Sequence, residues 1–238
     1  MINFPLEKML PYCEGFIDLD AERLEKLNIY GNLLLEWNEK MNLTAITEPN
    51  EVVFKHFLDC LLLLKSVELP ENASIIDVGT GAGFPGMVLA IVRPDIKVTL
   101  LDSLNKRITF LNDIIEKTGI TNVTAIHARA EEGSRQEKYR EQFDFATARA
   151  VAPLNILSEY CLPYVKKGGT FVSLKGPAAE SETKAAGKAI SLLGGGQAQA
   201  QSLTLAHYGE RTIIKIKKIS QTSPKYPRNS GKISKQPL

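Results

Sequence analysis

The sequence is poor in cysteine and histidine, and it has no long apolar run. Its 238 residues include three cysteines and three histidines, none of them at the close spacing of a zinc site. We therefore expect a metal-free protein with reduced thiols. The longest apolar runs, residues 60–64 and 87–92, fall far short of the roughly 18 residues that a bilayer span requires. The N-terminus also lacks the pattern of a secretory signal, so we expect a cytoplasmic protein without a membrane segment.

Acidic residues are absent from the segment 211–238, which contains eight Lys and Arg residues. Because the whole chain has a net charge of +2, residues 1–210 have a net charge of −6. A basic segment of this kind contacts nucleic acid phosphates or is simply a solvated end of the chain, and charge alone favours neither role. Its last dozen residues contain Pro227, Gly231 and Pro237, so we expect no regular structure there.

Two patterns divide the chain. Apolar residues in 24–37 and, after Pro49, in 52–61 have the spacing of amphipathic helices. From residue 74, short aliphatic strands alternate with helices, which is typical of a parallel sheet covered on both faces. We expect three parts, listed in chain order: a helical extension over 1–70, an α/β domain over 71–220 and a basic tail over 221–238.

The second pattern predicts seven strands. They are expected at residues 74–78, 97–101, 123–127, 143–148, 170–174, 199–205 and 211–217. The last two are close enough in sequence to form a hairpin. Helices are expected over 104–117, with Ser103 as its N-cap and Gly119 as its stop, and over 153–166.

The segment IIDVGTGAGFPG, residues 75–86, predicts a ligand-binding turn. Gly79, Gly81 and Gly83 stand between an aliphatic strand and a helix, where a ligand can approach the backbone and the free amides of the helix. The spacing is GxGxG, with Phe84 in place of the third glycine of the GxGxxG dinucleotide fingerprint, and no P-loop motif is present. This spacing argues against a nicotinamide cofactor and a P-loop hydrolase. A tight turn without a ligand is the alternative.

Side chains after the later strands indicate a nucleoside ligand. Asp102 lies about 20 residues beyond the glycines, where a carboxylate commonly accepts from ribose hydroxyls, although an acid near a helix start is also ordinary. Ala130 and Glu131 follow the third strand, at a place where a backbone amide and a carboxylate meet an adenine edge. Arg149 and Lys175 end the fourth and fifth strands. Because the carboxyl ends of parallel strands meet at one edge, we expect one cleft.

Several segments together are closely similar to a known family. They are DVGTGAGFPG, LLDSLNKRITFL, ARAEE, FDFATARAVAPL and SLKGP, with LLLEWNEKMNLTAIT and HFLDC upstream and PKYPRNSGKISKQPL downstream. Over residues 30–238 the sequence resembles the bacterial RsmG family, also called GidB. One departure is Cys60, where the family commonly has Ser, and it leaves the HFLD motif intact.

The resemblance implies a class I, Rossmann-like α/β methyltransferase fold with a mixed seven-stranded sheet, whose last strand is antiparallel, and an N-terminal helical extension. It implies transfer of a methyl group from S-adenosylmethionine to guanine N7 in 16S ribosomal RNA, as naked RNA or in the small subunit. We expect a monomer. Cofactor contacts implied by the family are Gly79, Phe84, Ala130, Glu131 and Arg149, and strand geometry adds Gly81, Gly83, Asp102 and Ser103.

Guanine N7 has a lone pair and no proton, so we expect no catalytic general base and assign the rate to alignment of the reactants. The candidates for RNA contact are Lys106, Arg107, Lys175, Lys225, Arg228, Lys232 and Lys235. For Lys106 and Arg107, bracing of the cleft or a solvated helix face is the alternative. Deletion of residues 224–238 is expected to weaken RNA binding without changing cofactor affinity.

Two other functions remain open at this point. A nicotinamide-dependent oxidoreductase would share the α/β architecture, although the glycine spacing argues against it. A non-catalytic RNA-binding module of the ribosome would fit the basic segment, but it would not need a nucleoside pocket. Binding of a methyl donor separates both from a methyltransferase.

Overall fold

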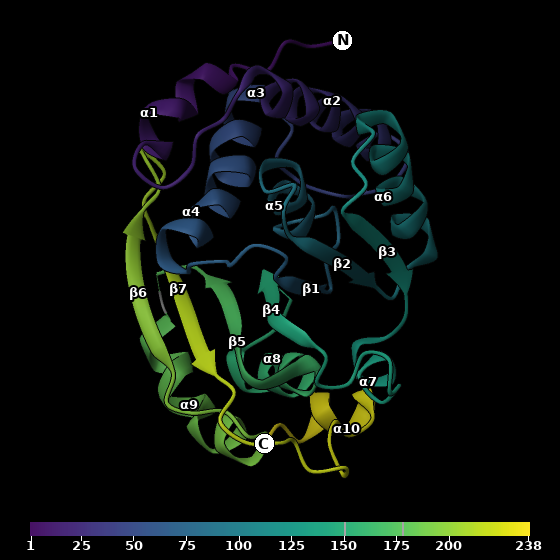
Figure 1. Cartoon of the computed structure of the whole chain (residues 1–238), viewed down its shortest axis with the longest axis vertical. Coiled ribbons are helices and arrows are strands. Elements are labelled where there is room, and N and C mark those ends of the chain that lie inside the picture. The colour runs from purple at the N-terminus through teal and green to yellow at the C-terminus, as the bar shows by residue number, and fades with distance from the viewer. Residues whose placement is uncertain (150, 178) are drawn as a thin grey trace.

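The computed structural model describes residues 1–149, 151–177 and 179–238. Its centre is a seven-stranded sheet in the order β3-β2-β1-β4-β5-β7-β6 (Figure 1). The strands are β1 Ser74–Val78, β2 Lys97–Asp102, β3 Val123–His127, β4 Phe143–Arg149, β5 Val165–Lys175, β6 Gln199–Thr204 and β7 Glu210–Lys217. Strands β1 to β5 pair in parallel, and β7 runs antiparallel to both β5 and β6. The predicted mixed sheet and its final hairpin are confirmed.

Successive strand residues point to opposite faces of the sheet, and each face is buried in its own apolar cluster. Ile75 and Leu100 belong to one apolar cluster, whereas their neighbours Ile76 and Leu101 belong to another. Helices α5 and α6 cover the first face, and α8 and α9 cover the second (Figure 1). The helices of the α/β part are α5 Gly86–Val92, α6 Asn105–Thr118, α7 Ala130–Gly133, α8 Leu154–Cys161, α9 Ala179–Leu192 and α10 Ser230–Lys235.

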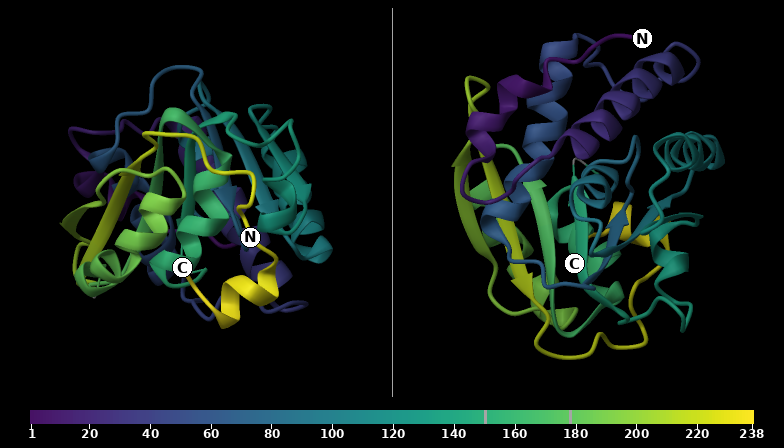
Figure 2. Two further views of the ribbon diagram at one scale, coloured as in Figure 1. Left: turned by 90° about the horizontal axis from the view of Figure 1, so that it is seen from below. Right: turned by 45° about the horizontal axis from the view of Figure 1, so that its top comes forward.

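The N-terminal helices pack against the first face of the α/β part (Figure 2). They are η1 Leu6–Met9, α1 Leu10–Cys13, α2 Ala21–Asn38, α3 Pro49–Val52, the π-helical η2 Val53–Leu58, and α4 Asp59–Ser66. Helix α2 lies on α5 and α6, and α4 lies beside α5 and contacts β7. The buried side chains of the N-terminal helices form one continuous cluster with those of α5 and α6. In addition, Tyr30 donates its hydroxyl to the carbonyl of Ala82 at 2.5 Å. The helical extension therefore shares its core with the α/β part.

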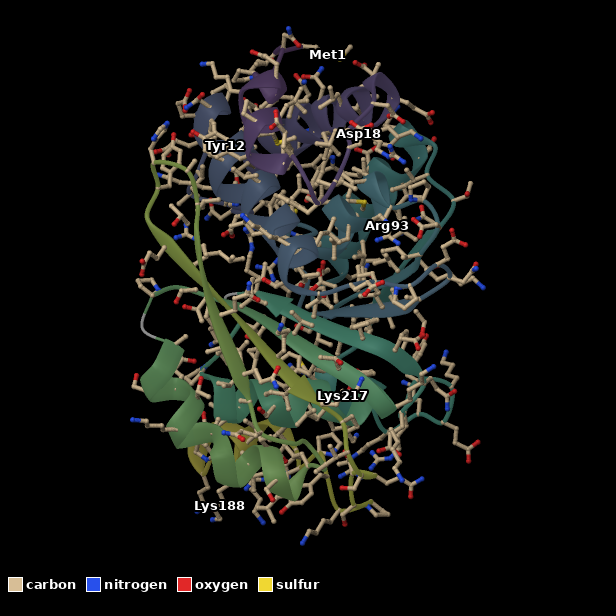
Figure 3. The ribbon with its side chains drawn as sticks, turned by 60° about the vertical axis from the view of Figure 1, so that its left-hand side comes forward. Met1, Tyr12, Asp18, Arg93, Lys188 and Lys217 are labelled. Atoms are coloured by element: carbon tan, nitrogen blue, oxygen red, sulfur yellow. The ribbon has the colours of Figure 1, made fainter. Side chains whose placement is uncertain are left out.

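The two ends of the molecule are formed by different parts of the chain. Figure 3 shows Met1 and Tyr12 at the end formed by the N-terminal helices, and Lys188 and Lys217 toward the opposite end. Among the described residues, no helix is long and apolar enough to cross a membrane. The same residues contain no group of three or more His, Cys, Asp and Glu side chains arranged to hold a metal ion.

Three local predictions are wrong. Ser103 is not the N-cap of α6. The N-cap is Leu104, which has no capping side chain, and the Leu104 amide donates to the carboxylate of Asp102. The helix expected over 153–166 ends at Cys161: a short 3-10 turn containing Pro163 follows, and Val165 then pairs with Phe143 in the sheet. Proline stops a helix because it lacks an amide proton and clashes with the preceding turn.

The third wrong prediction concerns the end of the chain, where α10 forms despite the nearby prolines and glycine. Asn229 caps this helix by accepting from the amide of Lys232 at 2.9 Å. Ile233 is buried, and Arg228 pairs with Glu159 of α8 at 2.6 Å. A good N-cap and one buried apolar side chain therefore order a segment whose composition suggested irregular structure.

Candidate functional site

A cleft of about 460 Å³ opens at the carboxyl ends of β1, β2, β3 and β4. Eight of the nine residues predicted to contact a cofactor line it, and they are Gly79, Gly81, Phe84, Asp102, Ser103, Ala130, Glu131 and Arg149. The ninth, Gly83, lies behind the cleft. The parallel strands thus bring together residues that are up to 70 positions apart in the sequence, as the topology requires.

The glycine turn after β1 is held from below by Asp77. One oxygen of this buried carboxylate accepts from the Thr80 hydroxyl at 2.6 Å and the Gly86 amide at 2.9 Å. The other accepts from the Thr147 hydroxyl at 3.2 Å. Burial raises the pKa of Asp77 to about 6, although these donors oppose the rise. Asp77 is therefore a bracing residue, and its oxygens are used within the protein.

The glycines of the turn have different roles. Gly81 has φ +60 and lines the cleft, and a Cβ atom there would meet only the Gly79 carbonyl oxygen, at 4.0 Å. Gly83 has φ +100, and a Cβ atom there would lie 2.8 Å from the Tyr30 hydroxyl and 2.9 Å from Cβ of Met87. Gly81 thus leaves room for a ligand, whereas Gly83 allows the turn to pack against α2 and α5.

Asp102 joins the end of β2 to the glycine turn. Its Oδ2 accepts from the Gly81 amide at 2.9 Å and from Arg107 at 3.3 Å, and its Oδ1 accepts from the Leu104 amide at 2.9 Å. A carboxylate oxygen accepts about two hydrogen bonds, so Oδ1 retains one site for a donor in the cleft. Arg107 also lines the cleft, and its ion pair with Asp102 favours the bracing alternative.

The end of the cleft next to β3 combines the predicted Ala130 and Glu131 with residues that the sequence did not indicate. Ala130 and Glu131 begin the short α7, and Tyr164 donates its hydroxyl to the Ala130 carbonyl at 2.7 Å. Tyr160 from α8 and Ser230 from α10 line the same cleft. The C-terminal segment is therefore part of the site, although its sequence indicated only a basic tail.

The opposite end of the cleft is formed by Arg149 and the N-terminal helices. The Arg149 guanidinium donates to Asp59 at 2.8 Å and to Nδ1 of His56 at 3.1 Å, and it lies 4.5 Å from the Phe84 ring centre. The His56 ring stacks on the same Phe84 ring at 4.4 Å. Asp59 also accepts from Arg211 at 2.8 Å, so two guanidiniums share one buried carboxylate.

His56 is neutral in this arrangement. Burial, together with the nearby Arg149 charge, lowers its pKa to about 3. A guanidinium only donates, so Nδ1 must accept from Arg149, and the ring proton of neutral His56 is then on Nε2. Nε2 lies 2.8 Å from the Thr44 hydroxyl, which also lines the cleft. Sequence reasoning assigned no role to Thr44.

Several of the basic residues expected to contact RNA have partners inside the protein. Lys175 contacts the Ala152 carbonyl at 2.6 Å and Glu182 at 2.8 Å, and Arg228 pairs with the buried Glu159. Lys218, which belongs to the basic segment but was not a candidate for RNA contact, is buried against Glu141 at 2.9 Å. Exposed side chains remain at Lys106, Lys225, Lys232 and Lys235. Much of the basic charge of segment 211–238 therefore stabilises the fold.

The structure also changes the expectation for deletion of residues 224–238. The deletion would remove Ser230 from the cleft and leave Glu159 buried without Arg228. An unpaired buried charge is strongly destabilising, so cofactor affinity would not stay normal. Single substitutions at exposed lysines are the better probe of RNA binding.

The cleft has the features of a nucleoside site. The open space above Gly81 allows close approach to the backbone, and Asp102 keeps one acceptor for a ribose hydroxyl. Ala130 and Glu131 present an amide and a carboxylate at the β3 end. These features match the nucleoside part of S-adenosylmethionine. The turn after β1 also lacks the wider glycine spacing of dinucleotide-binding proteins.

Comparison with known proteins identifies the family. The family model for rRNA small subunit methyltransferase G (GidB) matches residues 23–214. A Clostridium botulinum protein named ribosomal RNA small subunit methyltransferase G is 51% identical over 93% of both chains. A Lactobacillus acidophilus protein of the same name is 47% identical over 98% of this chain and 99% of that protein.

A solved structure of a SAM-dependent O-methyltransferase from Thermotoga maritima has the same fold. Its TM-score is 0.52 at 18% identity, over 80% of this chain and 72% of that one. This likeness concerns the fold alone, and the closer sequence relatives show the family. The chain therefore belongs to the rRNA small subunit methyltransferase G family of S-adenosylmethionine-dependent methyltransferases.

Proposed function

We propose that the protein methylates N7 of a specific guanine in 16S ribosomal RNA. The names of its close relatives support the small-subunit RNA as substrate. The methyl donor supplies an electrophilic methyl group on a sulfonium. The acceptor atom of guanine has a lone pair and needs no deprotonation. A cleft without a general base near the methyl group is therefore sufficient for the reaction.

One observation favours an acceptor without a proton: the imidazole in the cleft is unable to act as a base. Nδ1 of His56 accepts from Arg149, and Nε2 holds the ring proton toward Thr44. The remaining carboxylates belong to the nucleoside end, where Asp102 follows β2 and Glu131 follows β3. The side chains near β1 and β4 therefore align the reactants and exclude water, which is catalysis by proximity.

Residues Gly79, Gly81, Phe84, Asp102, Ser103, Ala130, Glu131 and Arg149 would hold the donor. Arg149 is already fixed by Asp59 and His56. Its guanidinium therefore positions the Phe84 ring and the N-terminal helices at this end of the cleft. A cation directly on the purine would oppose the positive charge that N7 acquires, so this fixed position is favourable for the reaction.

Four exposed lysines are proposed to contact RNA phosphates. Lys106 lies next to Arg107, which lines the cleft, and Lys232 and Lys235 lie in α10, whose first residue Ser230 also lines it. Lys225 precedes the buried Tyr226 in the segment that leads to this helix. Cations on two sides of the mouth would orient the RNA backbone while a guanine enters from a loop or an unfolded end.

The test is transfer of a labelled methyl group from S-adenosylmethionine to 16S RNA and to 30S particles from a strain that lacks this gene. Strand scission at 7-methylguanine then maps the product. A single labelled guanine is the expected result. Label at another base atom, or measurable donor binding with no transfer to either substrate, would contradict the proposal.

A further inference from the structure

The loop that precedes α3 is fixed at the edge of the cleft by side chains on both of its sides. Asn38, the last residue of α2, accepts from the amides of Leu43 and Thr44 at 2.8 and 2.9 Å. The Thr44 hydroxyl accepts from the Ile46 amide at 3.0 Å and lies 2.8 Å from Nε2 of His56. Leu43 and Thr44 both line the cleft.

The direction of the hydrogen bonds at Thr44 follows from the donors around it. Because the Arg149 guanidinium only donates, Nδ1 of His56 accepts and Nε2 donates to the Thr44 oxygen. The Ile46 amide is the second donor to that oxygen. A hydroxyl oxygen has two acceptor sites and one proton, so both acceptor sites are filled. Among the residues that the structure describes, none accepts the remaining proton.

The position of Thr44 indicates which part of the reactants it meets. Asp102 and Ala130 mark the nucleoside end of the cleft, after β2 and β3. Thr44 is tied through His56 to Arg149 at the end of β4, on the opposite side of the central β1. This is the end where the methyl group and the acceptor base would meet, on the basis of the proposed function.

We propose that the Thr44 hydroxyl donates a hydrogen bond to O6 of the acceptor guanine and so selects guanine over adenine. N7 and O6 lie on the same edge of guanine, and both are acceptors. Adenine presents N7 beside an amino group, which is a donor. Since Thr44 has only a proton to offer, an adenine amino group would face it donor against donor. His56 and Arg149 are positioning residues that fix the orientation of this hydroxyl.

The inference rests on the proposed guanine-N7 reaction, and the test is designed to separate the two. The protein variants are Thr44→Val, which removes the hydroxyl at nearly equal size, Thr44→Ser, which keeps it, and Thr47→Val, which changes an exposed residue of the same loop outside the cleft. The full chain is used with 30S particles. kcat, KM and the dissociation constant of S-adenosylmethionine are measured for each variant.

The substrates differ only at the mapped guanine. They contain guanine, inosine, which keeps O6, or 2-aminopurine, which lacks it, introduced into 16S RNA by ligation before assembly into particles. For the unmodified protein, we expect kcat/KM to fall about 10- to 100-fold with 2-aminopurine and little with inosine. Thr44→Val should show a similar fall on guanine and no further fall on 2-aminopurine, because both changes remove the same hydrogen bond.

The controls keep the result interpretable. Thr44→Ser and Thr47→Val should retain the preference for guanine, and all variants should keep normal cofactor affinity. The inference is overturned when the losses from Thr44→Val and 2-aminopurine multiply, or when Thr44→Val weakens binding of S-adenosylmethionine instead. Failure of the unmodified protein to methylate guanine N7 at all would overturn the proposed function, which is a separate outcome.

Discussion

The cleft has two walls of different construction. The sheet wall consists of the loops after β1, β2 and β3, and it leaves open backbone at Gly81 and one free acceptor on Asp102. The helical wall consists of Thr44, His56 and Asp59 together with Arg149, and its charged groups are bonded to one another. The sheet wall therefore has free groups for a cofactor. In the helical wall the polar groups bind one another, and among the described residues only the hydroxyl proton of Thr44 is left for a ligand.

The helical wall also joins parts of the chain that are far apart in sequence. Arg149 reaches Asp59 across 90 positions, and Arg211 reaches the same carboxylate across 152 positions. The wall thus depends on pairing between the N-terminal helices, β4 and β7. We expect substitutions in this wall to change the stability of the protein more than its cofactor affinity.

The largest expected effect tests the helical wall. Asp59→Asn removes the buried charge shared by Arg149 and Arg211, and we expect the free energy of unfolding to fall by about 3 kcal/mol, because two partly buried guanidiniums lose their charged partner. Urea denaturation measures this change. Glu36→Gln is the matched control, since Glu36 pairs with Lys40 while both side chains are more than half exposed, and it should cost about 0.5 kcal/mol or less.

The next effect tests the sheet wall. Gly81→Val places a branched side chain in the open space of the cleft, and we expect the affinity for S-adenosylmethionine to fall about 100-fold, or about 2.7 kcal/mol. Titration calorimetry gives the dissociation constant. Gly119→Val introduces the same strain at φ +66, also into open space but at the end of α6. Equal loss of affinity in both variants would mean that backbone strain, and not blocking of the cleft, is the cause.

A smaller effect is expected at the rim between the walls. Lys232→Gln removes one exposed cation beside the cleft mouth, and RNA affinity should fall several-fold, with the slope of log affinity against log salt decreasing by about 0.7 to 0.9. Filter binding over a range of salt concentrations measures both. Lys97→Gln, at the amino end of β2 on the opposite edge of the sheet, should change neither. Cofactor affinity should stay normal in both variants.

The smallest expected effect concerns the pH dependence of His56 in the helical wall. The pKa of His56 is lowered to about 3, so the native protein binds fewer protons than the unfolded chain between that value and 6.5. The stabilising effect is complete above pH 6.5 and is lost as the pH falls toward 3. At assay pH the ring stays neutral, and kcat should show no step near 6.5. A step there that disappears in His56→Gln would show that His56 titrates during the reaction.

The sheet wall was predictable from the sequence because parallel strands place their carboxyl ends at one edge. That rule located Asp102 and Ala130 without any knowledge of side-chain contacts, and it also located Arg149, the one residue that the helical wall takes from the end of a parallel strand. The same rule was less accurate for Gly83, because a glycine required for packing and a glycine required for a ligand look identical in sequence. Only the distance to Tyr30 and Met87 distinguishes them.

The helical wall was not predictable in the same way. His56 lies within a run of apolar helical residues, and nothing local indicates that its ring turns toward Phe84 and Arg149. Thr44 follows the end of α2, where a Thr is ordinary loop chemistry. The C-terminal helix gave one usable signal, Asn229 as an N-cap before Ile233, but the prolines around it outweighed that signal.

The contribution of Ser230 to the cleft has a consequence for biosynthesis. The N-terminal helices and the glycine turn emerge from the ribosome well before Ser230, although all three border the same cleft. Arg228, which holds this segment against α8, is made equally late. The nascent chain thus lacks a complete binding cleft until these residues have emerged, and full cofactor affinity is expected only after that point.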